Sequence, residues 1–337
     1  MNYLLDLFSG IGGFTLGLQN AGIKFDEVYY SDIDKYANAV YKYNFPNHKE
    51  VGDVTSIRPE NLPKGRWVVT FGFPCQDLSI AGKRAGFEGK RSSLFYEATR
   101  IIRTLKPEVF IFENVKGLFS ANEGQDFISV LREIADIGLY DCEWQLVNTR
   151  WVLPQNRERI YFIGHLRGSS GSKVFPVGKP SQKSGGNEKG NYSGTVKEGF
   201  GKTQNDATYI CHTLDANYHK GIGKQYRECI IENQHQITTA QPRCGNPKKG
   251  GTGELSSSEY CFTLDSQPHI GNKIRRLTPI ECERLQGFPD NWTAKGNFDG
   301  EIKEISDTQR YKMCGNAVTV KIVEMIGKRL NDLSKVQ

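Results

Sequence analysis

The strongest constraint on the fold is a repeated alternation of short apolar runs with amphipathic segments. Apolar runs of about four to eight residues between turn residues predict buried strands. They occur at residues 3–8, 27–31, 67–72, 109–112, 144–148 and 160–164, with a third candidate strand at 51–54. Helical spacing follows at residues 14–21, 35–43, 94–105 and 127–137, and again at 318–330. Strand–helix–strand repetition predicts an α/β fold with a doubly wound, mostly parallel sheet.

Length and cysteine usage narrow the class of protein. The 337 residues suffice for two domains at about 100–200 residues each. No apolar run approaches the roughly 18 residues of a membrane span, and the start of the chain lacks the features of a signal peptide. The eight cysteines form no CxxC pair, which argues against a zinc site and a disulfide scaffold. We therefore expect no metal and a reducing cytoplasm.

The positive charge is concentrated in one part of the chain. The net charge is +6, and residues 167–274 contain 14 basic and 9 acidic residues together with 16 of the 36 glycines. This stretch is either a long flexible insertion or a loop-rich basic domain that contacts phosphates. Within it, residues 209–215 and 260–265 resemble each other, by chance or as two similar strand ends in one sheet.

Glycines and acidic residues follow the predicted strands at one sheet edge. Gly10, Gly12 and Gly13 lie between the first strand and the first helix, where backbone can approach a ligand closely. The spacing is not G-x-G-x-x-G, so a pyrophosphate site is not indicated. Asp32 and Asp53 follow the second and third strands. Together they predict an adenosine-containing cofactor without a diphosphate, although each alone fits a tight turn, a helix cap or a solvated carboxylate.

A second group of residues predicts covalent chemistry on a pyrimidine. Cys75 follows the strand at 67–72, and Glu113 ends the next strand. A thiolate beside a carboxylic acid that protonates a ring nitrogen suits conjugate addition, whereas a lone cysteine is more often a small buried hydrophobe. Arg157 and Arg159 alternate along a strand, so both can point into the site. The glycines and basic residues of 76–91 suit a lid that contacts phosphates.

Six motifs in order resemble one family. They are D-L-F-S-G-I-G-G-F at 6–14, G-F-P-C-Q at 72–76, E-N-V at 113–115, Q-N-R-E-R at 155–159, R-R-L-T-P-I-E-C-E-R-L-Q-G-F-P at 275–289 and G-N-A-V at 315–318. Over nearly its whole length the chain resembles the DNA (cytosine-5)-methyltransferases of bacteria and phages. The resemblance implies a Rossmann-like, S-adenosylmethionine-dependent methyltransferase fold with a second, smaller, loop-rich recognition domain that contains β-strands.

The resemblance implies roles for individual residues. Cys75 matches the nucleophile, Glu113 the acid at the cytosine ring, Arg159 the arginine that orients both, and Arg157 a supporting arginine. The residues that match S-adenosylmethionine contacts are Phe8, Gly10 and Gly12 in the turn, Asp32 at the ribose, Ile33 and Asp53 at the adenine, Leu94 and Asn316. In the implied mechanism, a cytosine flips out of the duplex, the thiolate adds to carbon 6 and carbon 5 receives the methyl group.

The resemblance also implies a division into domains and a DNA-binding surface. We expect a catalytic and cofactor-binding domain at 1–165 plus 306–337 and a target-recognition domain at 166–305. Candidate DNA contacts are Gln76, Ser79, Lys83, Arg84, Arg91, Thr213, Arg227, Gln241, Arg243 and Thr263, some of which could equally contact phosphate or solvent. Thr213 and Thr263 each begin a Thr-Leu pair, and either pair could be the recognition element.

Two other functions are alternatives to DNA methylation for a chain with these motifs. One is a tRNA methyltransferase on the same frame, against which the long basic region favours DNA. The other is a non-enzymatic DNA-binding relative, against which the intact Cys75, Glu113 and Arg159 argue. We expect a monomer that acts on double-stranded DNA in a restriction-modification or phage DNA-protection system, with a possible companion endonuclease. The recognised bases do not follow from the sequence.

Overall fold

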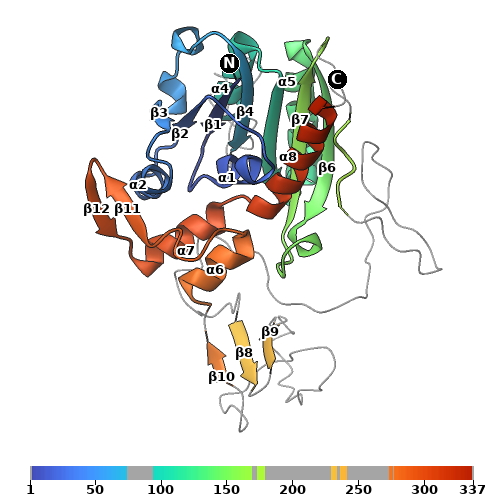
Figure 1. Ribbon diagram of the computed structural model, residues 1–337. Helices are drawn as coiled ribbons and strands as arrows, with labels where there is room; N and C mark the ends of the chain where they lie inside the picture. The colour runs from blue at the N-terminus through green and yellow to red at the C-terminus, as the bar shows by residue number, and fades with distance from the viewer. Residues whose placement is uncertain are drawn as a thin grey trace, which may run out of the picture.

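A seven-stranded sheet forms the centre of the computed structural model (Figure 1). The structure describes residues 2–73, 94–168, 173–178, 229–233, 236–240, 273–275 and 277–335. The sheet order is β3-β2-β1-β4-β5-β7-β6. Its strands are β1 (Asn2–Leu7), β2 (Glu27–Ser31), β3 (Lys49–Glu50), β4 (Arg66–Gly72), β5 (Val109–Val115), β6 (Tyr140–Asn148) and β7 (Glu158–Leu166).

In this sheet only β7 is antiparallel to both of its neighbours. The pairs from β3 to β5 are parallel, whereas β7 is antiparallel to both β5 and β6. The order reverses between β1 and β4, the kind of switch point at which doubly wound sheets bind ligands. The predicted Rossmann-like, mostly parallel fold is confirmed.

Helices cover both faces of this sheet (Figure 1). The helices are α1 (Gly13–Asn20), α2 (Lys35–Asn44), α4 (Leu94–Leu105), α5 (Gln125–Ile137), α6 (Pro279–Gln286), α7 (Asp307–Asn316) and α8 (Val320–Lys335). Short 3-10 helices lie at Val54–Ser56, Pro59–Asn61, Lys116–Phe119, Ala121–Gly124 and Thr149–Trp151. Side chains alternate across β5: Phe110 and Phe112 pack in one core cluster with α4 and α5, and Ile111 packs in the other with α1 and α8. The last helix therefore returns to the sheet, as predicted.

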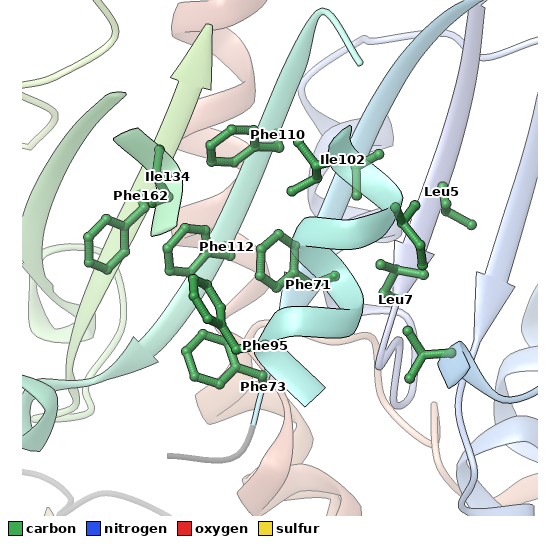
Figure 2. Close-up of a cluster of buried hydrophobic side chains, with 14 of the residues drawn as sticks. Leu5, Leu7, Phe71, Phe73, Phe95, Ile102, Phe110, Phe112, Ile134 and Phe162 are labelled. Carbon is green, nitrogen blue, oxygen red and sulfur yellow. The ribbon is translucent and has the colours of Figure 1, made fainter. Parts of the chain in front are cut away.

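Aromatic rings fill the core beside the carboxyl ends of β4 and β5 (Figure 2). The ring of Phe112 stacks on Phe71 and Phe162, with centroids 4.8 and 4.3 Å away. Phe73, directly after β4, packs 4.8 Å from Phe95 of α4. All five rings are buried. Their packing fixes the end of β4, where the G-F-P-C-Q motif begins with Gly72.

The predicted strand at 51–54 is wrong in position. The sheet pairing stops after β3, with Tyr30 opposite Glu50. Gly52 then adopts a φ of 76°, and the Asp53 carboxylate accepts the backbone N–H of Thr55 at 2.9 Å, which starts a 3-10 turn. The predicted final helix also starts two residues later than expected, at Val320, and runs to Lys335.

Residues 277–305 pack against the sheet domain. The segment contains α6 and a hairpin of β11 (Lys295–Phe298) and β12 (Glu301–Glu304). Phe288 and Ile305 share a core cluster with Val40 of α2. The Trp292 indole N–H donates to the carbonyl of Ile11 at 2.9 Å. This segment therefore covers the turn that follows β1.

A separate three-stranded antiparallel sheet lies in the predicted recognition region. Its order is β10 (Lys273–Arg275), β8 (Cys229–Asn233) and β9 (Gln236–Ala240). Figure 1 shows these strands apart from the seven-stranded sheet. The second region thus contains β-strands, as predicted.

We expect Gly17→Ala to destabilise the fold by about 1–2 kcal/mol. A Cβ on Gly17 would lie 2.5 Å from the Val323 Cβ, where α1 crosses α8. Alanine's higher helix propensity favours the variant by about 1 kcal/mol, but overpacking costs about 1–3 kcal/mol and more when the contact is this short. Denaturant unfolding of Gly17→Ala and of Gln19→Ala, on the exposed face of α1, makes the comparison. A Gly17→Ala protein as stable as the wild type would contradict this packing.

Candidate functional site

The turn after β1 has an unusual backbone. Phe8, Gly10 and Gly12 have φ angles of 51°, 53° and 85°. A Cβ on Gly12 would lie 2.5 Å from the Phe45 ring, so packing requires glycine there. A Cβ on Gly10 would meet no atom within 4 Å, so the space beside Gly10 is open. The strained Phe8 backbone is typical of a functional turn.

Asp32 connects this turn to the end of β2. Its carboxylate accepts the backbone N–H of Gly10 at 2.8 Å and that of Asp34 at 2.8 Å. Burial raises the pKa of Asp32 above its usual value. A carboxylate offers about four lone-pair positions, so both oxygens keep capacity to accept hydroxyl donors. The next residue, Ile33, is 78% exposed, which leaves an apolar surface beside the carboxylate.

The remaining predicted cofactor residues lie around the same sheet edge. Ser31 at the end of β2 donates from Oγ to the Gly52 carbonyl at 2.5 Å, which holds the exposed Asp53 beside β2. Leu94 begins α4 and packs, like Phe8, against the large core cluster. Asn316 ends α7 and is exposed.

A buried hydroxyl at the turn also points to a ligand. Ser9 Oγ is buried and has no hydrogen-bond partner among the residues that the structure describes. Gly10 is the next residue in the chain, and the Ser9 N–H donates to the carbonyl of Ser31 at 3.0 Å, directly before the Asp32 carboxylate and the exposed Ile33. These groups match the hydroxyls and apolar ring of a nucleoside, so the residues present fit an adenosine-containing group.

An ion pair forms the centre of the predicted catalytic residues. Glu113 on β5 and Arg159 on β7 lie 2.9 Å apart, Oε1 to Nε, with side chains 11% and 14% exposed. Asn114 follows Glu113, and its side-chain amide donates to the Phe73 carbonyl at 3.1 Å. The end of β5 therefore holds the backbone two residues before Cys75, which lies outside the described residues.

The structure separates the roles of the two arginines in the Q-N-R-E-R motif. Arg159 lies on β7, whereas Arg157 precedes the first residue of that strand, Glu158. The buried Arg157 guanidinium, however, donates to the carbonyls of Gly315 at 3.3 Å and Ala317 at 2.9 Å. Its contacts fix the backbone on either side of Asn316, whereas Arg159 forms the ion pair with Glu113.

Sequence reasoning missed a buried carboxyl beneath the cofactor turn. Asp6 accepts Thr15 Oγ1 and Thr70 Oγ1, each at 2.8 Å, which joins β1 to α1 and β4. Burial raises its pKa from 3.8 to about 7. Asp6 is the first residue of the D-L-F-S-G-I-G-G-F motif, but sequence reasoning assigned it no role. Asn114 lies inside the E-N-V motif and was also assigned no role, because nothing in the sequence indicates that its amide reaches the Phe73 carbonyl.

Many predicted contacts fall outside the described residues. They are Cys75, Gln76, Ser79, Lys83, Arg84, Arg91, Thr213, Arg227, Gln241, Arg243 and Thr263. Among the residues that are described, no group of His, Cys, Asp and Glu could hold a metal ion. No described helix has the length and apolar character needed to cross a membrane.

Comparison with known proteins decides the family. Residues 3–332 match the C-5 cytosine-specific DNA methylases. The chain belongs to this family. It is 33% identical over 330 residues to the Type II methyltransferase M1.ScrFI of Lactococcus lactis subsp. cremoris, covering 97% of this chain and 77% of that protein. It is 32% identical over 332 residues to M.HpaII of Haemophilus parainfluenzae, covering 97% and 88%.

A solved structure supports the fold of this methylase. The Entamoeba histolytica methyltransferase EhMeth matches with a TM-score of 0.60 at 18% identity, covering 100% of this chain and 99% of that one. The family match confirms a DNA (cytosine-5)-methyltransferase, as the six motifs predicted. Methylation of DNA is the activity by which the family is described, which favours DNA over tRNA and an enzyme over a binding protein.

We expect the Asp6 carboxyl to make the stability of this methylase depend on pH. The folded pKa lies above the unfolded value, so the folded chain binds the proton more tightly. The contribution of Asp6 to stability therefore falls as pH rises from about 4 to about 7, by about 1.4 kcal/mol per pH unit. Asp6→Asn removes this dependence and keeps the shape.

Chemical denaturation at a series of pH values measures the effect. His48, whose pKa burial lowers to about 4, gives the opposite slope in both proteins, so the difference between them isolates Asp6. The stability of Asp6→Asn relative to wild type should rise across this range. Parallel pH curves would show that Asp6 does not titrate between about 4 and 7.

Proposed function

We propose that the chain methylates carbon 5 of a cytosine in a specific double-stranded DNA sequence through a covalent adduct of Cys75. The observation that carries this proposal is the Glu113–Arg159 ion pair. It lies at the sheet edge where Gly72 pairs with Glu113, and the G-F-P-C-Q motif continues directly from Gly72.

The methyl donor in this proposal is S-adenosylmethionine, which supplies an electrophilic methyl group on a sulfonium. Asp32 would accept the ribose hydroxyls, and Ile33 would pack against the adenine. Asp53 would accept the adenine amino group. The contacts of the turn would come from Phe8, Gly10 and Gly12, and further contacts from Leu94 and Asn316. The open space at Gly10 and the unpartnered Ser9 hydroxyl support this assignment.

The catalytic residues have separate tasks in this proposal. The Cys75 thiolate forms a bond to carbon 6 of the cytosine, and the displaced electron pair moves toward ring nitrogen 3 and carbon 5. Glu113 donates a hydrogen bond or proton at nitrogen 3, and Arg159 keeps its carboxyl oriented. Carbon 5 becomes nucleophilic and accepts the methyl group as the bond between that group and the donor sulfur breaks, which would leave S-adenosyl-L-homocysteine. Loss of the carbon 5 proton to solvent or base then returns the electron pair and expels the Cys75 thiolate.

The target base must leave the duplex for this addition. Carbon 6 of a stacked cytosine is covered by neighbouring bases, so the enzyme must flip the nucleotide into the site. We assign DNA contact to Gln76, Ser79, Lys83, Arg84 and Arg91 beside the nucleophile, and sequence readout to Thr213 or Thr263 with Arg227, Gln241 and Arg243. The charge concentrated in residues 167–274 supports phosphate contact there.

We propose a recognition domain that ends before residue 277. Our sequence-based boundary at 305 places α6 and the β11–β12 hairpin in that domain. The Trp292–Ile11 hydrogen bond and the cluster of Phe288 and Ile305 with Val40 support their assignment to the catalytic domain instead.

We further propose that the enzyme acts as a monomer in the cytoplasm. If a companion restriction endonuclease cleaves the same sequence, the enzyme is part of a restriction-modification system. If the enzyme is encoded by a phage, it protects the phage DNA. The names of the Type II relatives support the first arrangement.

We predict that DNA carrying 5-fluorocytosine at the target traps the enzyme. Fluorine replaces the carbon 5 hydrogen whose removal as a proton would expel Cys75. The Cys75 adduct therefore persists. Bisulfite sequencing of DNA from cells that express the protein identifies the target, and denaturing gels with that duplex detect the adduct. Cys75→Ala should abolish the trap. Cys142→Ala is the matched control, because burial raises the pKa of that thiol to about 12 and the variant should trap like the wild type.

If the wild-type protein does not become trapped on the 5-fluorocytosine duplex of its identified target sequence, the proposed adduct is contradicted. Transfer to tRNA with none to duplex DNA would contradict the proposed substrate.

We predict that Glu113→Gln lowers kcat by about 10²–10⁴-fold, the usual contribution of a positioned acid. The amide keeps the shape but cannot supply a proton to nitrogen 3. DNA affinity, measured by fluorescence anisotropy, should change little. Glu158→Gln is the control, because Glu158 pairs with Lys116 in the same sheet region with a side chain 38% exposed. Equal loss of activity in both variants would count against a specific role for Glu113.

A further inference from the structure

Buried hydrogen bonds join three separate parts of the catalytic domain. Thr149 Oγ1, just after β6, lies 2.8 Å from Thr319 Oγ1 at the start of α8. Thr319 Oγ1 donates to Gln286 Oε1 at 3.2 Å, and Gln286 Nε2 donates to the Cys314 carbonyl at 2.8 Å. The side chains of Thr149, Thr319 and Gln286 are all at most 2% exposed.

The chemistry of the groups fixes the direction of every bond. A backbone carbonyl only accepts, so the Gln286 amide nitrogen must face Cys314 and its oxygen must face Thr319. That oxygen only accepts, so the Thr319 hydroxyl donates to it. The Thr149 hydroxyl must then donate to Thr319. No member can reverse its bond without leaving a buried polar group unpaired, which makes this chain of hydrogen bonds a single rigid arrangement.

The same region holds the backbone around Asn316 on both sides. Gln286 binds the carbonyl of Cys314, and Arg157 binds those of Gly315 and Ala317. The Ala317 N–H donates to the Met313 carbonyl at 3.0 Å. Asn316 itself is exposed. The molecule thus presents this one polar side chain from a fixed turn.

Two contacts link this turn to the proposed catalytic and cofactor residues. The backbone of Thr319 lies beside the buried Tyr161, two residues after Arg159 on β7, and Val318 packs against the core cluster that contains Tyr161. Val318 packs against the cofactor turn so closely that a Cβ on Gly13 would lie 2.7 Å from its Cγ2. Displacement of residues 318 and 319 would therefore reach both the ion-pair strand and the turn after β1.

We propose that Thr319 and Gln286 are positioning residues that set Asn316 and the cofactor turn relative to β7. Gln286 is the last residue of α6, the first helix after the recognition region, so the hydrogen bonds also connect that region's end to the site. The proposal rests on the function proposed above. It assigns no contact with substrate to Thr319, Thr149 or Gln286.

A matched pair of substitutions at Thr319 tests the proposal. Thr319→Val keeps the shape and removes the hydroxyl, whereas Thr319→Ser keeps the hydroxyl and removes the methyl group. Thr104→Val is the control, because Thr104 is exposed at the far end of α4 and makes only a bond to the Arg100 carbonyl. For each variant we would measure kcat, KM for target DNA, Kd for S-adenosylmethionine and thermal unfolding.

We expect Thr319→Val to lower kcat and weaken S-adenosylmethionine binding about tenfold each, which corresponds to the loss of one buried hydrogen bond. KM for DNA should stay within about twofold. Thr319→Ser should unfold at a lower temperature but keep wild-type kcat and Kd. Thr149→Val removes the first donor without altering residues 314–319, and should show the same losses if Thr319→Val does not fold.

A purely structural role gives a different pattern. Thr319→Val and Thr319→Ser would then both lose stability while the folded enzyme keeps wild-type kcat and Kd, and this result would overturn the proposal. Equal loss of kcat in Thr319→Ser would overturn it as well. Failure of the proposed function is distinguishable, because the wild-type protein itself would then methylate no DNA.

Discussion

The ion pair between Glu113 and Arg159 depends on the one strand that reverses direction in the sheet. Glu113 lies near the carboxyl end of β5, and β7 is antiparallel to β5. The second residue of β7 therefore arrives at that end, with Arg159 paired to Val115. A parallel strand would bring its carboxyl end there and place the start of Q-N-R-E-R at the opposite edge. The topology of the sheet thus brings Arg159 to Glu113, the residue to which we assign the acid role.

The rest of the core holds this edge in place. Phe71, Phe112 and Phe162 stack across the neighbouring strands β4, β5 and β7 (Figure 2), and Phe112 directly precedes Glu113. Stacked rings pack without voids, so the strands have little freedom to slide. Buried polar bonds then locate the chain more finely, since Asn114 binds the Phe73 carbonyl and Arg157 binds the backbone beside Asn316. Apolar packing fixes the positions of the strands, and directional hydrogen bonds fix the backbone beside the proposed site residues.

Periodicity predicted most of the sheet domain because its strands are buried on both faces and read as apolar runs. The strand at 27–31 was predicted at its observed bounds. The strand at 51–54 was misplaced because β3 makes only two paired residues, which leaves little apolar signal. The family resemblance implied that Arg159 lies near Glu113, but no spacing indicates that Arg157 binds carbonyls 158 and 160 positions away. Gln286 lies in one of the six motifs and Thr149 and Thr319 lie in none, and only the fold brings the three side chains together.

The central claim is that this edge of the sheet adds a methyl group to carbon 5 of cytosine in DNA. Incubation of the purified protein with duplex DNA and S-adenosylmethionine, followed by digestion to nucleosides and mass spectrometry, tests it most directly. The account predicts 5-methyl-2′-deoxycytidine as the methylated nucleoside. Methyl groups found only on an exocyclic nitrogen of cytosine or adenine would contradict it, because that product needs neither a Cys75 adduct nor an acid at ring nitrogen 3.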